Sequence, residues 1–283
     1  AAALLGVTVG SVISFLVLWL TYRLRGDGIT REQLARAPAP ARRKTIVAAL
    51  VRTAVPVALG ALAVNLSSLV DTAFLQNRMN ALMQPDAEAL LSQYGPFLRP
   101  EDIAQGRVPT ALFGCYTNAL TLFTIVPAMT QAFGISALPN VTAAWAGGSR
   151  VKLEHSVENV LRISALVTMP AGLALSVLAD PIARLLGYNP ISGRILVLLG
   201  LGAVFAAVNV PINSMLQAVG RIDLPVKLLC TGLVIKVGLN YALTGIPEIN
   251  VMGAGMGTLV CYFFLAFFGL AALGRETGLH MRL

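Results

Sequence analysis

The sequence has few charged side chains: Asp, Glu, Lys and Arg together make up 12% of its 283 residues, and apolar residues make up 56%. A water-soluble domain carries about 25% charged residues, so this composition excludes an ordinary soluble globular fold. Histidine and cysteine are also scarce, at 2 and 3 residues. The cysteines lie inside apolar segments without a CxxC spacing, which argues against a disulfide framework and a metal site.

The net charge of +8 does not indicate nucleic-acid binding, because the basic residues lie in the connections between apolar segments. That is where the positive-inside rule places them in membrane proteins. The sequence also contains no nucleophile–base pair, no glycine-rich phosphate loop and no set of metal ligands. We therefore predict neither an enzymatic activity nor a cofactor.

Seven apolar segments follow one another along the chain, and each is long enough for a helix to cross roughly 30 Å of hydrocarbon. The sequence therefore predicts an all-α membrane protein with seven transmembrane helices. Because residue 1 is Ala and already lies in an apolar segment, we expect the chain to be part of a longer protein. The segments are residues 1–22, 45–75, 108–139, 160–186, 194–219, 224–244 and 250–273.

The connection 23–44 carries six arginines and one lysine against two acidic residues, which predicts a cytoplasmic location. Alternation then places the connections 145–159 and 220–223 on the cytoplasmic side as well. The long connection 76–107 falls on the outer side. Its Pro85-Asp86 and Pro100-Glu101-Asp102 sequences are typical of helix starts, so short helices are expected there.

Ionisable and polar candidates for ligand binding occur inside four of the predicted spans, and the charged candidates lie in two of them. Arg52, Asn65 and Asp71 lie in the second span, and Lys236 and Asn240 lie four residues apart in the sixth. In one interpretation Arg52 and Lys236 extend to the headgroups, while Asp71 caps its helix or pairs with Arg78. In the other interpretation these groups line a water-filled cavity, as charged residues within membranes usually do.

Amides recur on one face of the fifth span, where Asn209, Asn213 and Gln217 are spaced four residues apart. The third span is also polar and includes Asn118. Such amides are costly in lipid unless they meet another helix or water, so they either hold helices together or face a cavity. We predict that the second, third and fifth spans line a common cavity. Prolines within four spans add bends that suit a carrier: Pro56, Pro127, Pro170 and Pro211.

Several short sequences resemble the stage V sporulation protein B-like flippases, a polysaccharide-transporter branch of the multidrug/oligosaccharidyl-lipid/polysaccharide exporter superfamily. The resemblance keeps its order over nearly the whole chain. The matching sequences are VPVALG at 55–60, LSSLVDT at 66–72, YTNA at 116–119, PAMT at 127–130, LQAVGR at 216–221, KVGLN at 236–240 and GAG at 253–255.

The resemblance implies a fold of about fourteen helices in two six-helix lobes. Residues 1–22 would be the last helix of the first lobe, 23–44 the cytoplasmic linker, 45–273 the second six-helix lobe and 274–283 a cytoplasmic tail. It further implies a flippase of the cytoplasmic membrane, active in cell-envelope polysaccharide biosynthesis. Such a protein moves lipid-linked saccharides, including peptidoglycan precursors, between leaflets by alternating access.

In such a flippase, Arg52 and Lys236 would meet a pyrophosphate across the cleft between the lobes, while the amides would meet sugar hydroxyls. Two functions remain open beside it: a cation-coupled multidrug exporter of the same superfamily, which would favour buried carboxylates, and a non-transporting scaffold for envelope assembly. The candidate substrate-binding residues are Arg52, Asn65, Asp71, Asn118, Asn209, Asn213, Gln217, Lys236 and Asn240.

Overall fold

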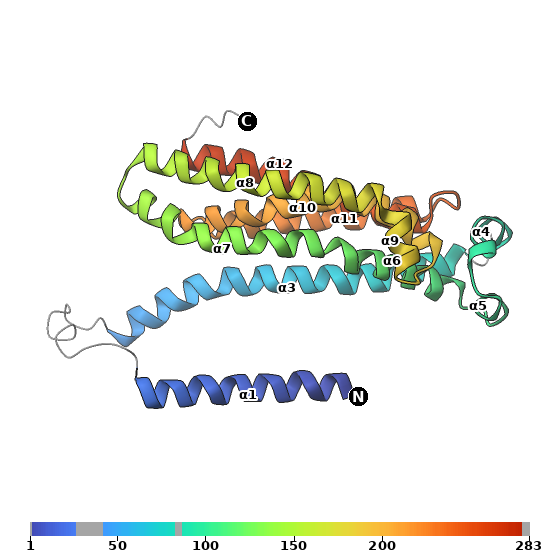
Figure 1. The fold of residues 1–283 in the computed structure, drawn as a ribbon, viewed down its shortest axis with the longest axis horizontal. Coiled ribbons are helices and arrows are strands. Elements are labelled where there is room, and N and C mark those ends of the chain that lie inside the picture. Colours follow the sequence, from blue (N-terminus) through green and yellow to red (C-terminus); the bar gives the residue numbers. More distant parts are fainter. Residues whose placement is uncertain (1, 27–41, 83–86, 279–283) are drawn as a thin grey trace. The chain divides into compact units, whose positions relative to one another are not determined.

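The computed structural model describes residues 2–26, 42–82 and 87–278, which form helices and no strands (Figure 1). This confirms the prediction of an all-α membrane fold. The chain divides into two compact units, Ala1–Leu50 and Val51–Leu283. The helices are α1 (Ala2–Arg25), α3 (Arg43–Leu82), α4 (Ala87–Tyr94), α5 (Pro100–Ala104), α6 (Val108–Phe123), α7 (Ile125–Ala146), α8 (Arg150–Val177), α9 (Ala179–Leu185), α10 (Pro190–Ala218), α11 (Asp223–Thr244) and α12 (Val251–Thr277), with the short 3-10 helix η1 (Gly95–Phe97).

Five stretches of the described chain are long and apolar enough to cross a membrane, and a shorter apolar helix covers Val9–Leu24. The five correspond to the predicted third to seventh spans. The predicted first and second spans fall within α1 and the 40-residue helix α3. Whether these two helices also cross the membrane stays a prediction, and the predicted linker lies mostly outside the described residues.

Two of the long apolar segments are interrupted at a position set by proline. Helix α6 ends at Phe123 and α8 ends at Val177, which lie four residues before Pro127 and Pro181. A proline has no N–H to donate to the carbonyl four residues earlier, and its ring clashes with that carbonyl. The chain resumes as α7 after Thr124 and as α9 after Leu178, so each break is a bend within a continuous helical segment.

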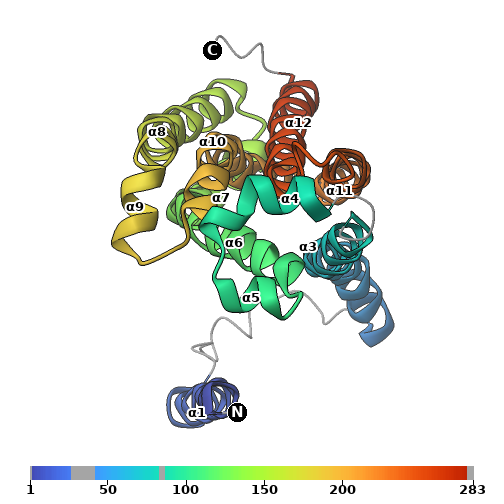
Figure 2. The same cartoon turned by 90° about the vertical axis from the view of Figure 1, so that its right-hand side faces the viewer.

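Helix α10 is the central element of the second unit. It packs against α6, α7, α8, α9 and α12 and lies between these helices in the end-on view (Figure 2). Small residues bring its neighbours close: a methyl group on Gly200 would lie within 3 Å of the Ser176 backbone on α8. Small residues at such contacts are how membrane helices approach each other without a hydrophobic driving force.

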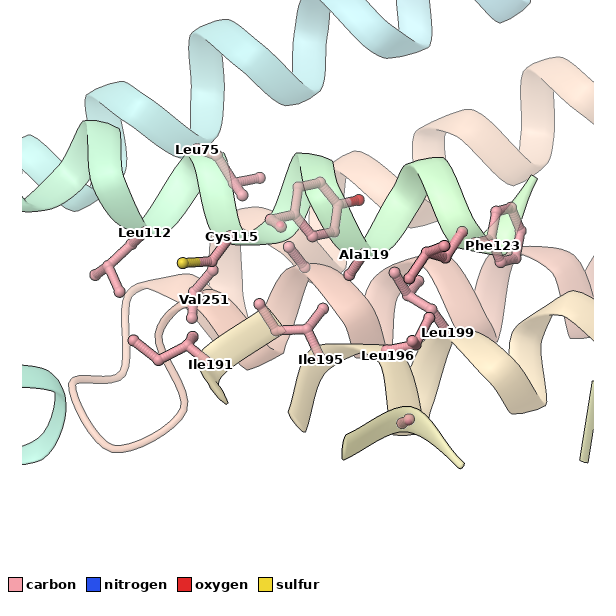
Figure 3. Close-up of a cluster of buried hydrophobic side chains, with 14 of the residues drawn as sticks. Leu75, Leu112, Cys115, Ala119, Phe123, Ile191, Ile195, Leu196, Leu199 and Val251 are labelled. Carbon is pink, nitrogen blue, oxygen red and sulfur yellow. The ribbon is translucent and has the colours of Figure 1, made fainter. Parts of the chain in front are cut away.

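Figure 3 shows part of the main core, in which buried side chains from several helices lie together. Leu75 of α3, Tyr116 and Ala119 of α6 and Ile195 of α10 are each at most 1% exposed. Val251, at the start of α12, is also fully buried in this cluster. Four helices from distant parts of the sequence therefore meet in one apolar layer.

The segment after α3 forms a cap over this core. Gln93 donates to the Glu248 carbonyl at 2.9 Å, Tyr94 donates to the Ile249 carbonyl, and Asn189 donates to the Phe97 carbonyl. Burial raises the pKa of Tyr94 above its ordinary value, so its hydroxyl stays protonated and keeps donating. The short helices expected in this connection are present, and the Pro100 start is confirmed as the first residue of α5. Pro85 lies outside the described residues.

Two predicted boundaries differ from the structure. The connection expected at 145–159 is shorter, because α8 already begins at Arg150 and leaves a turn at 147–149. Helix α3 continues to Leu82, beyond the predicted end of its span at residue 75. Both helices extend past their apolar segments through polar residues, which hydropathy alone does not assign to a helix.

The proline inside α10 frees a backbone carbonyl for a hydrogen bond from α7, and the contribution of this bond to stability can be measured. Pro211 leaves the Ala207 carbonyl without its usual partner, and the Thr130 hydroxyl of α7 donates to that carbonyl at 2.9 Å. Thr130→Val should lower the free energy of unfolding by about 1 kcal/mol, measured by denaturant titration in detergent micelles. Thr142→Val is the control, since the Thr142 hydroxyl bonds only within α7; an equal loss in both variants would contradict this interpretation.

A buried ion pair between helices α3 and α11

One stripe of helix α11 is buried against the rest of the protein. Gly232, Lys236, Asn240 and Thr244 recur every four residues and are its buried positions. Residues four apart lie on one face of an α-helix, so the stripe follows from the spacing. The neighbouring positions Val234 and Tyr241 are 72% and 52% exposed, which places them on a lipid-facing side.

Helix α12 opposes this stripe with small residues. Gly253 and Gly257 lie four residues apart, and Cys261 continues the same face. A methyl group on Gly257 would collide with the Asn240 side-chain oxygen, and one on Gly253 would lie 2.7 Å from Leu243. The glycines therefore create the space that the polar face of α11 occupies.

Asp71 of α3 meets this polar face. Its carboxylate lies 2.5 Å from the Lys236 ammonium and accepts a hydrogen bond from the Asn240 amide at 3.1 Å. The two charged side chains are only 10% and 7% exposed. A charge that is removed from water is tolerated when it is paired and hydrogen-bonded, and all three helices contribute to that condition.

A second polar contact lies on the α6 side of α12. The Tyr116 hydroxyl and the Thr258 hydroxyl are 3.0 Å apart, and both residues are almost completely buried. Thr258 is adjacent in sequence to Gly257, so the ion pair and this hydroxyl contact flank the same turn of α12.

The alternative in which Asp71 pairs with Arg78 is wrong. The Arg78 guanidinium instead lies 4.6 Å from the centre of the Tyr241 ring, close to Gly245, at the end of α11. A cation over an aromatic face is stabilised by the ring quadrupole. Asp71 is thereby left to Lys236 and Asn240.

Arg52 and Lys236, which the resemblance places together at a pyrophosphate, have different surroundings in the structure, and their binding of a common ligand stays a prediction. Lys236 is buried and neutralised by Asp71. Arg52 is exposed and precedes Asp71 by 19 residues on the same helix, a rise of about 28 Å. The two cations therefore occupy different depths and different electrostatic environments.

The amides of α10 differ in exposure along the helix. Asn209 is 8% exposed and lies against Gly269 of α12, Asn213 is half-buried and Gln217 is exposed. Asn209 thus fills a helix–helix contact, as in the packing interpretation. Asn118 of α6 is half-buried, and the Asn65 side chain lies outside the described residues. A cavity shared by the second, third and fifth spans stays a prediction.

The Asp71–Lys236 pair was missed although the sequence contained a signal for it. Lys236 lies eight residues before the end of α11, and Asp71 lies eleven residues before the end of α3. Both helices end on the predicted outer side, so the opposite charges are at similar depths. The Gly253–Gly257 spacing was a second signal for a helix that accepts a polar neighbour.

A comparison with protein families adds independent information. Residues 106–242 match the MatE family. The match runs from the start of α6 to near the end of α11, slightly less than half of the chain. It includes Lys236 and Asn240 but not Asp71. No curated protein and no solved structure shows significant similarity to the chain.

MatE domains belong to the multidrug/oligosaccharidyl-lipid/polysaccharide exporter superfamily, whose members are transporters and not enzymes. Together with the five apolar helices, the match supports a multi-pass membrane transporter. It is compatible with both lipid-linked saccharide and drug export.

Removing one member of the pair should be far more harmful than removing both. Asp71→Leu or Lys236→Met alone should lower the free energy of unfolding by about 3–5 kcal/mol, because each leaves a buried charge unpaired. The double variant should recover most of that loss. Lys227→Met breaks the exposed pair with Asp223 and should cost less than about 1 kcal/mol. Single variants as mild as Lys227→Met would contradict the pairing.

Gly257 should be intolerant of any side chain. Gly257→Ala places a methyl group where the Asn240 oxygen lies, so we expect a lower thermal unfolding temperature and looser packing of α11 against α12. Gly238→Ala is the matched control, because no atom lies within 4 Å of a methyl group there. That control should be neutral or stabilising, since alanine favours helix by about 1 kcal/mol over glycine. Thermal unfolding in detergent would compare the two.

Proposed function

We propose that this chain is the second half of a flippase that moves lipid-linked saccharides across the cytoplasmic membrane by alternating access. The proposal extends the transporter class supported by the MatE match to a particular substrate. Its substrate would combine a pyrophosphate, a hydrophobic lipid and sugars. The single observation that carries the proposal is that the buried carboxylate Asp71 is already neutralised by Lys236.

A cationic drug or a coupling proton requires a carboxylate that is available to bind it. Asp71 is the one acidic side chain that is buried among the residues the structure describes. Its two oxygens face the Lys236 ammonium and the Asn240 amide. A cationic cargo would have to displace both donors, whereas an anionic cargo would pair with the ammonium and leave the carboxylate its hydrogen bond from Asn240.

In this proposal the Lys236 ammonium is therefore the member of the pair that binds the substrate. A phosphate oxygen that replaces the Asp71 carboxylate would receive a charge-assisted bond from Lys236, while Asn240 keeps a bond to Asp71. Arg52, which is exposed on the same helix as Asp71, would meet the headgroup earlier, at the predicted cytoplasmic end. The two cations would then act in sequence along the path.

The amides would serve the sugar portion. Asn213 and Gln217 are accessible on α10, and Asn118 is half-buried on α6, so these three would donate to or accept from saccharide hydroxyls. Asn209 would hold α10 against α12. This division of roles follows from exposure, because an amide side chain that binds the substrate must be accessible to it.

Transport into vesicles tests the substrate. The full-length protein that contains residues 1–283 would be reconstituted into vesicles with a fluorescent undecaprenyl-pyrophosphate-linked sugar. Transfer between leaflets would be followed by chemical quenching of the labelled lipid in the outer leaflet. Arg52→Ala should slow transfer about tenfold or more, because a charge-assisted bond contributes about 1.5–3 kcal/mol. Asp71→Leu with Lys236→Met should fold yet transfer poorly, because the ammonium is missing.

A cationic dye provides the opposing measurement. If dye export is fast, is abolished by Asp71→Asn and is unaffected by Lys236→Met, the multidrug-exporter alternative is correct and the saccharide proposal is wrong. If neither cargo moves while a partner protein co-purifies, the scaffold alternative is favoured.

A further inference from the structure

An open cavity with both apolar and polar lining residues lies at the other end of the bundle, between α7 and α8. It has a volume of about 420 Å³ and is formed by the last turns of α7, the turn at 147–149 and the first two turns of α8. Its polar lining residues are Asn140, Ser149, Lys152, His155 and Ser156. This cavity is far from the α3–α11 ion pair, since α8 begins on the predicted cytoplasmic side.

The lining carries positive charge and hydrogen-bond donors and no carboxylate. Lys152 contributes an ammonium, the two serines contribute hydroxyls, and His155 and Asn140 contribute a ring and an amide. The acidic residues of this part of α8, Glu154 and Glu158, are exposed and do not line the cavity. An anion is therefore the ligand that this set of groups favours.

The turn itself leaves donors available. Gly148 adopts a positive φ of 64°, which allows the chain to reverse between the two helices. Ser149 is the N-cap residue of α8, but its hydroxyl makes no capping hydrogen bond. Both that hydroxyl and the first N–H groups of α8 are thus free of a capping bond at the edge of the cavity.

The surroundings of the cavity indicate where its ligand comes from. Trp145 is 43% exposed and Val151 is 78% exposed, one on each side of the turn. Exposed tryptophan beside basic residues is typical of the boundary between hydrocarbon and water. In the predicted orientation the cavity would face the headgroups of the cytoplasmic leaflet, whose anionic lipids attract basic residues.

We propose that this cavity binds a phosphate group at the membrane surface, supplied by the headgroup of an anionic phospholipid. Lys152 would pair with the phosphate charge, and Ser149, Ser156 and His155 would donate to its oxygens. The bound lipid would anchor the α7–α8 turn to the anionic leaflet. This site is independent of the proposed saccharide path, because it uses none of its residues.

Trp145 provides a direct reporter for this site. Residues 1–283 contain 2 tryptophans, so Trp19→Phe, with any tryptophan outside this segment also replaced by Phe, leaves Trp145 as the single tryptophan. The protein would be placed in bilayers of phosphatidylglycerol and phosphatidylcholine in which one lipid or the other carries bromine on its acyl chains. Stronger quenching of Trp145 fluorescence by brominated phosphatidylglycerol than by brominated phosphatidylcholine, at equal content, would show preferential binding of phosphatidylglycerol. The association constant for phosphatidylglycerol relative to phosphatidylcholine would then exceed one.

Lys152→Gln should lower that constant about tenfold, since it removes a charge-assisted hydrogen bond to the phosphate worth about 1.5 kcal/mol or more. Lys227→Gln is the matched control, because it removes the same charge from an exposed lysine outside the cavity, at the same predicted side. It should leave the constant nearly unchanged. An unchanged constant in Lys152→Gln, or an equal loss in both variants, would overturn the proposal.

Inorganic phosphate separates the two sources of the same chemistry. If added phosphate reverses the quenching in the wild type but not in Lys152→Gln, the cavity accepts free phosphate as well as a headgroup. If it has no effect while Lys152→Gln still loses the preference, the site requires the lipid itself. Both outcomes support a phosphate site and identify its ligand.

Discussion

The pairing of Asp71 with Lys236 is the interaction on which the other features of this bundle depend. Two charges are held between helices where water is almost excluded, and such a pair persists only if each partner is satisfied. Asn240 supplies the additional hydrogen bond, Gly257 supplies the space for Asn240, and the Tyr116–Thr258 contact flanks the same turn of α12. Asp71 of α3, which lies outside the MatE match, thus pairs with Lys236 and Asn240, which lie within it.

The remaining helices are joined by hydrogen bonds to backbone carbonyls, at positions where a proline or a small residue makes these carbonyls accessible. Pro127 and Pro181 end helices four residues earlier, whereas Pro211 leaves a carbonyl that Thr130 of the adjacent helix satisfies. Ser176 makes a comparable bond to the Val197 carbonyl, where Gly200 allows α8 and α10 to approach. These hydrogen bonds join α10 to its neighbours. They matter because the hydrophobic effect does not drive helices together within lipid.

Hydropathy was sufficient to predict helices, their approximate number and their order, because the length of an apolar segment is set by the thickness of the bilayer. It could not locate the end of α3 or the start of α8, where polar residues continue a helix beyond the hydrocarbon. The face of Lys236 and Asn240 could be predicted from their spacing, but the partner of Lys236 could not be read from spacing within one helix. Asp71 lies 165 residues away, and only the fold brings the two together.

The central claim is that the Lys236 ammonium exchanges the Asp71 carboxylate for a substrate phosphate. Infrared difference spectroscopy on the reconstituted protein tests it most directly, with Asp71→Asn used to assign the carboxylate band. Adding an undecaprenyl-pyrophosphate-linked sugar should shift the Asp71 carboxylate stretch as the ammonium leaves, and a cationic dye should not. A shift with the dye and none with the pyrophosphate lipid would contradict the account.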